Sequence, residues 1–130
     1  MMPTPEDLAR IAEVEFAEVE FADIVDSTEI LGTKMRIVLV EGGFVDVWLS
    51  RKLEGRFGFH WEHEATGRSY RYDNFPNTKW KHVSTYPYHF HNGSQDNVVD
   101  SSRFGRDIMD GFRDFMRWVR LKLGDEEGDD

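Results

Sequence analysis

The sequence predicts an α+β fold: an N-terminal helix, an antiparallel β-meander of four to five strands, and a long amphipathic C-terminal helix packed on the sheet. Two patterns predict it. Short extended runs follow one another with tight turns between them, and apolar residues recur at spacings of three and four near the C-terminus. The 130 residues are 39% hydrophobic and 14% aromatic, which supports one core, but the chain is too short for two. We expect a single domain over residues 1–124 and an acidic, disordered tail at 125–130.

The first expected element is a helix that begins near Thr4. Thr4 suits the cap, Pro5 suits the first helical position, and the acidic residues that follow favour the positive end of the helix dipole. From Glu18 to Val25 the apolar residues alternate with others, which indicates an edge strand.

The meander is predicted from alternation and from glycine-containing turns. Gly42-Gly43 joins two runs that favour strands, which is a strong hairpin signal. With the edge strand, the expected strands are residues 18–25, 35–41, 44–49, 56–64 and 68–73. After them comes an irregular stretch with one short extended piece, Tyr88 to His91.

The C-terminal helix is expected to begin at the capping residues Asp100-Ser101-Ser102 and to end at Gly124. Its apolar side chains lie at the spacing of one helical face: Phe104, Ile108, Phe112, Phe115, Met116, Val119 and Leu123.

The composition restricts the function classes. The chain has no cysteine, which excludes disulfides, thiolate metal sites and cysteine nucleophiles and fits a reducing cytoplasm. The first residues lack the basic and apolar regions of a signal peptide, and no apolar run approaches the ~20 residues of a membrane span. We therefore expect a cytoplasmic protein with no membrane partner.

The net charge of −9 is unevenly distributed. Residues 1–29 hold nine acidic residues and one basic residue, residues 125–130 hold five acidic residues, and residues 30–124 hold 15 basic and 11 acidic residues. An acidic protein repels nucleic acid on average, because phosphate contacts need Lys and Arg. The basic middle keeps RNA binding open, whereas the plainer interpretation is that the acidic ends aid solubility.

Residues 68–92 carry the side chains best suited to chemistry. They hold four basic residues against one acidic residue, seven aromatic residues and three of the five histidines. Basic side chains attract phosphates, aromatic faces stack on unpaired bases, and histidine carries protons near neutral pH. An RNA-cleaving site could be built from two imidazoles as acid and base and a lysine that stabilises the phosphorane. The alternative is a packed aromatic loop that covers one end of the sheet.

The sequence also offers a metal alternative. His89-Phe90-His91 places both imidazoles on one face of an extended segment, where they could bind a metal if other ligands approached. The other ligands considered are His60, Glu62, His63 and Glu64. Nothing in the sequence brings those residues to the pair, so we predict no metal and no cofactor.

Two motifs stand in this segment: Tyr72-Asp73-Asn74-Phe75-Pro76 and Pro87-Tyr88-His89-Phe90-His91-Asn92-Gly93. With the later Val98 and Ser101, and with the order of the elements, they resemble the TumE family over nearly the whole chain. The family motifs usually read Tyr-Asp-Asn-Ala-Pro-His-His and Pro-His-His-Lys-His. His89 and His91 match, and the chain resembles a diverged member because it departs from the motifs at positions that include Phe75, Asn77, Tyr88 and Phe90.

The resemblance implies the toxin component of a toxin–antitoxin module, with a cognate antitoxin of helix-turn-helix type as partner. Combined with the basic, aromatic segment, it leads to the hypothesis of a metal-independent ribonuclease that acts on RNA or nucleotides. The hypothesis assigns His89 and His91 as acid and base, Lys81 as phosphate contact, and Tyr72, Asp73, Asn74, Arg71, Lys79 and Trp80 as substrate-binding groups.

The alternative hypothesis is a non-enzymatic protein-interaction module. In it the acidic N-terminal segment or an edge strand pairs with a partner, or a second copy forms a homodimer, and the His-aromatic loop is structural. Asp73-Asn74 before Pro76 then serves to end the strand, because Asx side chains bond their own backbone and Pro interrupts the ladder.

Overall fold

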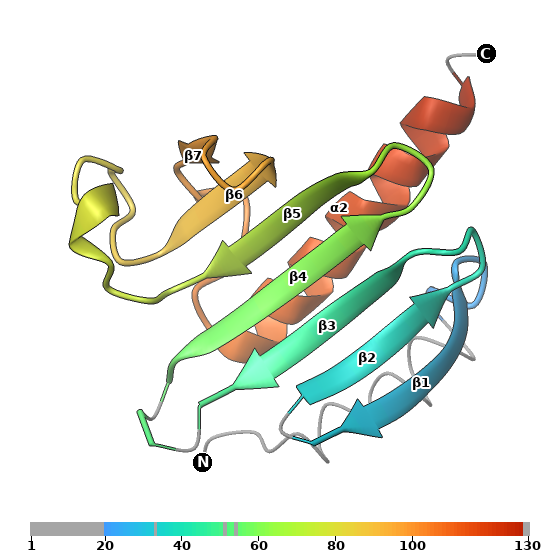
Figure 1. Ribbon diagram of the computed structural model, residues 1–130, viewed down its shortest axis with the longest axis horizontal. Coiled ribbons are helices and arrows are strands. Elements are labelled where there is room, and N and C mark those ends of the chain that lie inside the picture. Colours follow the sequence, from blue (N-terminus) through green and yellow to red (C-terminus); the bar gives the residue numbers. More distant parts are fainter. Residues whose placement is uncertain (1–19, 33, 51, 54, 129–130) are drawn as a thin grey trace.

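The computed structural model describes residues 20–128 except 33, 51 and 54 (Figure 1). The expected helix that begins near Thr4 and the first two residues of the strand expected at 18–25 lie outside these residues. The described elements are β1 (Val25–Leu31), β2 (Lys34–Leu39), β3 (Phe44–Leu49), β4 (Phe57–His63), β5 (Arg68–Asp73), the 3₁₀ helix η2 (Thr78–Trp80), β6 (His89–Gly93), β7 (Val98–Val99) and α2 (Ile108–Gly128).

The strands form one antiparallel meander in which each strand pairs with its neighbours in sequence, in the order β1-β2-β3-β4-β5-β6-β7. The prediction of four to five strands is therefore wrong, since the described residues form seven. The edge strand expected at 18–25 is also displaced, because residues 22–24 form a turn and β1 begins at Val25.

Two strands beyond the expected meander follow the β5–β6 loop, which comprises residues 74–88; the extended piece expected at Tyr88 to His91 overlaps the first of them, β6. This loop leaves the sheet at Asp73 and returns at His89, and the two residues are directly paired across β5 and β6. A hairpin closed by so long a loop carries none of the short turn signals that identify two-residue connections. The loop places η2 beside β6 at one side of the sheet (Figure 1).

One face of the sheet forms the hydrophobic core with α2, which lies behind β4 and β5 in Figure 1 and runs along these strands. The ring of Phe59 in β4 lies 5.5 Å from that of Phe112 in α2. The ring of Tyr70 in β5 lies 4.9 Å from that of Trp118 in α2. Alternate residues of the strands are buried on this face: Met35, Ile37, Leu39, Val45, Val47, Leu49, Phe57, Phe59, Trp61, Tyr70, Tyr72 and Phe90. Their neighbours in sequence therefore point to the opposite side of the sheet, which we call the open face.

The start of α2 differs from the expected cap at Asp100-Ser101-Ser102. Asp100 instead accepts hydrogen bonds from the backbone and hydroxyl of Ser102 and closes a local turn. The side chain of Asp107 accepts from the backbone N–H groups of Met109 and Asp110 at 3.1 and 3.2 Å, so Asp107 caps the helix. Phe104 packs into the core from the loop that precedes α2.

The helix α2 ends at Gly128, four residues after the expected Gly124. The division into a domain at 1–124 and a disordered tail at 125–130 stays a prediction. Within the described part of the chain, no helix combines the length and the apolar character needed to cross a membrane.

Candidate functional site

The open face carries two rows of side chains that run across the strands. Strand register defines the rows because directly paired residues point to the same face. The first row is Trp48, Gly58, Asp73 and His89, from β3 to β6. The second row is Asp46, His60, Arg71 and His91 over the same four strands. Segments far apart in sequence therefore meet on one surface.

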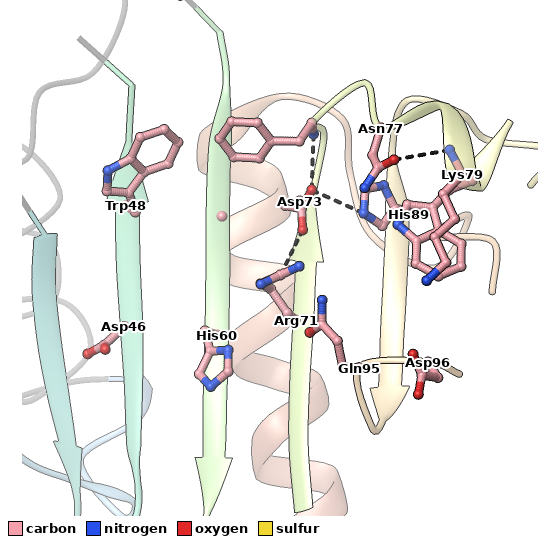
Figure 2. Close-up of a pocket in the computed structure, with 13 residues that line it drawn as sticks. Asp46, Trp48, His60, Arg71, Asp73, Asn77, Lys79, His89, Gln95 and Asp96 are labelled. Atoms are coloured by element: carbon pink, nitrogen blue, oxygen red, sulfur yellow. Dashed lines mark hydrogen bonds and ion pairs between the residues drawn. The ribbon is translucent and has the colours of Figure 1, made fainter. Parts of the chain in front are cut away.

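A cavity of about 420 Å³ lies over these rows (Figure 2). Gly58 contributes no side chain to the floor, which leaves space between Trp48 and Asp73. The ring of Phe75, from the β5–β6 loop, lies 5.1 Å from that of Trp48 and forms an aromatic wall. We call this the open-face cavity; the lining residues used below are Asp46, Trp48, Gly58, His60, Arg71, Asp73, Phe75, Lys79, Trp80 and His89.

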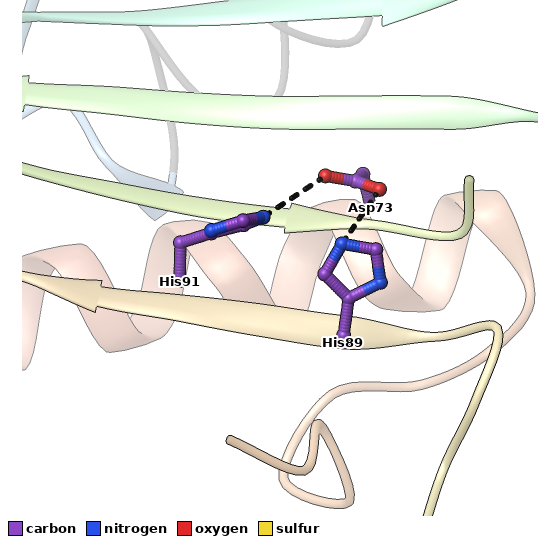
Figure 3. Close-up of side chains that lie close together, drawn as sticks. All are labelled: Asp73, His89 and His91. Atoms are coloured by element: carbon purple, nitrogen blue, oxygen red, sulfur yellow. Dashed lines mark ion pairs between the residues drawn. The ribbon is translucent and has the colours of Figure 1, made fainter. Parts of the chain in front are cut away.

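Asp73 is the most connected side chain of the site. Its carboxylate is 2% exposed and accepts hydrogen bonds from Arg71 Nε at 2.8 Å and from the backbone N–H of Phe75 at 3.0 Å. His89 Nε2 lies 3.2 Å from Oδ1 and His91 Nε2 lies 3.7 Å from Oδ2 (Figure 3). A buried carboxylate needs such partners, because removing it from water without compensation is costly.

The hydrogen bonds of His89 define the direction of its ring. Nδ1 lies 2.8 Å from the carbonyl oxygen of Pro87, and a carbonyl oxygen only accepts, so Nδ1 carries a proton. Nε2 therefore faces the Asp73 carboxylate. This contact is attractive only when a proton or another positive charge lies between nitrogen and oxygen.

The hydrogen bonds of His91 place its proton on Nδ1 and leave a lone pair on Nε2. Its Nδ1 donates to the carbonyl oxygen of Gln95 at 2.8 Å, and its Nε2 accepts from Arg71 Nη2 at 3.1 Å. Burial lowers the pKa of His91; the Gln95 bond opposes this effect and the nearby Arg71 charge adds to it. The ring is therefore a neutral imidazole whose Nε2 lone pair is covered by the guanidinium of Arg71.

The structure brings together five of the residues assigned from sequence. Arg71, Asp73, Lys79, Trp80 and His89 all line the open-face cavity. His91 lies directly behind it, with its ring centroid 5.0 Å from that of His89.

The other three assigned residues lie elsewhere. Lys81 is exposed and is not among the lining residues. Tyr72 faces the core: its hydroxyl donates to the carbonyl oxygen of Gly105 at 2.9 Å, and burial raises its pKa. Asn74 holds a turn, since its side chain accepts from the Phe57 backbone at 2.9 Å and donates to Gly55 at 2.7 Å.

Sequence reasoning missed Trp48, Gly58 and Phe75 as parts of the site. Strand pairing is the signal that could have found Trp48 and Gly58, because Trp48 and Asp73 flank Gly58 in one row, whereas Phe75 lies in the β5–β6 loop. The other metal ligands considered from sequence do not join the pair of His89 and His91. His60 Nε2 lies 2.6 Å from Glu62 Oε1, and His63 is buried on the core side. Among the described residues, Asp73, His89 and His91 form the one group of three with metal-ligand atoms, all within 4.8 Å of one another.

Comparison with known proteins gives one match. A family model described as Toxin TumE matches residues 8–123, which is most of the chain and includes the whole site. No curated protein and no solved structure matches the chain.

Proposed function

This chain belongs to the TumE toxin family, and we propose that it acts as a toxin by cleaving RNA, or a nucleotide of similar chemistry, in the open-face cavity. A toxin of this family implies an antitoxin partner, which we propose to be a small helix-turn-helix protein. The observation that carries the proposal is the pair of imidazoles, 5.0 Å apart and oriented by one buried carboxylate at an aromatic cavity.

The surroundings of the two histidines favour different protonation forms, which suits one ring to act as base and the other as acid. His91 presents a neutral Nε2 and serves as the base that takes the proton of a ribose 2′-hydroxyl. His89 holds a proton at Nε2 against Asp73 and serves as the acid. The 2′-oxygen then forms a bond to phosphorus, the bond to the 5′-oxygen breaks, and His89 protonates that oxygen. The products are a 2′,3′-cyclic phosphate and a 5′-hydroxyl, and no metal is needed.

Arg71 and Lys79 provide the positive charge for the phosphate. The side chain of Arg71 is 35% exposed. Its guanidinium can therefore give up the hydrogen bond to His91 and bind a phosphate oxygen, which uncovers the lone pair on His91 Nε2. Guanidinium groups bind phosphate oxygens through paired N–H donors. Lys79 takes the role that the sequence assigned to Lys81, since Lys79 lines the cavity and Lys81 does not.

The aromatic wall fits a nucleobase. Trp48 and Phe75 offer ring faces above the floor left by Gly58, and each base stacked on an aromatic side chain contributes about 1–3 kcal/mol to binding. The volume of about 420 Å³ lies within the range of ~300–1,000 Å³ that is usual for small-molecule sites. A single nucleotide of an unpaired strand is therefore the expected occupant.

Expression in a bacterial host tests the proposal. We expect growth to stop and RNA to be degraded when the chain is produced alone, and growth to recover when the neighbouring antitoxin gene is expressed with it. The double variant His89→Ala with His91→Ala should permit growth, whereas His82→Ala, which changes an exposed histidine outside the cavity, should remain toxic. Equal toxicity of the double variant and the wild type would contradict the proposal.

One observation favours a second candidate function. His89 and His91 are each 2% exposed, and both nitrogens of each ring have a partner within the fold. A non-enzymatic interaction module, with a structural histidine pair, would use such a network to fix β6 beside β5. That function predicts that a pull-down recovers a stoichiometric partner while the purified protein leaves RNA intact. The homodimer stays a prediction, tested by the molar mass in solution.

A further inference from the structure

We propose that Asp73, His89 and His91 bind a divalent transition metal, of which Zn²⁺ is the best fit, in place of the Arg71 guanidinium. One ligand atom from each of the three residues lies within 4.8 Å of the other two (Figure 3). Zinc bonds of ~2.0–2.1 Å in a tetrahedron place neighbouring ligand atoms about 3.3–3.4 Å apart. His89 Nε2 lies 3.2 Å from one oxygen of Asp73 and His91 Nε2 lies 3.7 Å from the other, so the side chains bind an ion after they close in by up to about 1.4 Å.

The rings are oriented as metal-binding imidazoles are. Each Nδ1 donates to a backbone carbonyl oxygen at 2.8 Å, Pro87 for His89 and Gln95 for His91. Such bonds orient the ring and direct the Nε2 lone pair toward a metal, and they are the usual partners of metal-binding histidines. For His89 the lone pair points at a carboxylate oxygen, an arrangement that requires a positive charge between the two atoms.

The ligands stand on a rigid support. Asp73 and His89 are directly paired across β5 and β6, and His91 is two residues along β6 on the same face. All three side chains are 2% exposed. Ligands held on paired strands keep their geometry better than ligands on loops, so little ordering is needed on binding.

Arg71 occupies the cation position in the described state. Its Nε bonds Asp73 at 2.8 Å and its Nη2 bonds His91 Nε2 at 3.1 Å, so the guanidinium uses a lone pair on each of two proposed ligands. A metal ion and this guanidinium therefore compete. The half-exposed side chain of Arg71 can move into solvent when a metal ion displaces it.

The donor set selects the class of metal. Two imidazoles and one carboxylate suit Zn²⁺ and its neighbours Co²⁺ and Ni²⁺, whereas Mg²⁺ and Ca²⁺ prefer sites made only of oxygen. A bound ion would use the Nε2 lone pairs of both histidines and would thereby block proton transfer. This inhibition rests on the proposed function, but metal binding itself does not.

Calorimetric titration of the untagged, metal-free chain with ZnCl₂ tests the site. We expect one ion per chain, no heat from MgCl₂, and a visible spectrum of tetrahedral Co²⁺ when CoCl₂ is used. His89→Gln and Asp73→Asn should each weaken Zn²⁺ binding by at least about tenfold. His60→Gln is the matched control, because His60 shares the open face and pairs with Glu62, the other imidazole–carboxylate pair on that face.

Arg71→Gln keeps the test decisive if the ligand variants fail to fold. Removing the competing guanidinium should tighten Zn²⁺ binding by about tenfold, a gain that damage to the fold does not produce. Weaker or unchanged Zn²⁺ binding in Arg71→Gln, or loss of binding in His60→Gln, would overturn the proposal. Because titration uses no RNA, failure of RNA cleavage and failure of metal binding are separate results.

Discussion

Two aspartates on the open face, Asp46 and Asp73, have different surroundings. Asp46 accepts two hydrogen bonds from Arg36, at 2.8 and 3.0 Å, and one from Lys34 Nζ at 2.9 Å. Asp73 has one arginine, Arg71, and two imidazoles as its ionisable partners. The side chain of Asp46 is 13% exposed and that of Asp73 is 2% exposed.

The difference shows how one surface can hold both a structural and a chemically responsive carboxylate. The partners of Asp46 are always charged near neutral pH. Burial raises the pKa of Asp46, but the hydrogen bonds from Arg36 and Lys34 outweigh that effect and hold it below its usual value. The two imidazoles beside Asp73 are the groups to which we assign proton transfer and metal binding, so the two proposals concern Asp73 and not Asp46.

Exchanging each carboxylate for an amide gives the largest contrast. Asp73→Asn should lower the RNA cleavage rate by at least about 100-fold, mainly in kcat, because the amide no longer stabilises a protonated His89. Asp46→Asn should keep the wild-type rate although it loses its ion pairs. Steady-state kinetics on a short oligonucleotide measures both. Equal loss in the two variants would remove the distinction between the two carboxylates.

A smaller effect separates the aromatic groups of the same face. Trp48→Ala should raise KM about tenfold with little change in kcat, because stacking contributes about 1–3 kcal/mol per base. Phe44→Ala is the matched control, since Phe44 lies under the guanidinium of Arg36 at 3.8 Å and outside the cavity. A rise in KM in the Phe44 variant alone would place the base site at the opposite end of β3 from Trp48.

The core face should respond in stability and not in activity. Tyr72→Phe removes the hydrogen bond to Gly105 and should lower the free energy of unfolding by about 1 kcal/mol. Its cleavage rate should equal that of the wild type, although the sequence placed Tyr72 among the substrate-binding groups. Denaturant unfolding and the kinetic assay report the two quantities. A lower rate at unchanged stability would return Tyr72 to the site.

The smallest effect is the acid response of Asp46. Its pKa is lower in the folded than in the unfolded chain, so its ion pairs stabilise the fold above the unfolded pKa of about 3.9. This stabilisation is lost as the pH falls through the folded value. The difference in unfolding free energy between wild type and Asp46→Asn should therefore shrink between pH 5 and pH 2. A constant difference over that interval would show that the ion pairs contribute nothing.

Much of the fold follows from local pattern. The runs expected at 35–41, 44–49, 56–64 and 68–73 correspond to β2, β3, β4 and β5, because alternation and glycine turns are local signals. The extended piece expected at Tyr88 to His91 overlaps β6, but its pairing with β5 across the β5–β6 loop, and the strand β7, follow from no local pattern. The start of α2 is also not fixed by local pattern. Asp100 and Asp107 are both suitable helix caps, and in the structure Asp100 closes a turn whereas Asp107 caps the helix.

The motifs and the basic segment contain several of the residues that line the open-face cavity. Asp73 and His89 belong to the two motifs, and Arg71 belongs to the basic, aromatic segment 68–92. Tyr72, which the first motif placed among the substrate-binding groups, lies between Arg71 and Asp73 on one strand, and strand alternation directs its side chain to the opposite face. Trp48 and Gly58 needed the register of three strands, which is information that the chain acquires only on folding.

The ends that cleavage leaves on RNA distinguish a histidine ribonuclease from a binding module. We expect the purified, metal-free chain to cleave an oligoribonucleotide to 2′,3′-cyclic phosphate and 5′-hydroxyl ends, and His89→Ala to leave the same RNA intact. Replacing the target nucleotide by its 2′-deoxy form should also stop cleavage, because the nucleophile is absent. Intact RNA with the wild-type chain, or equal cleavage by His89→Ala, would contradict the account.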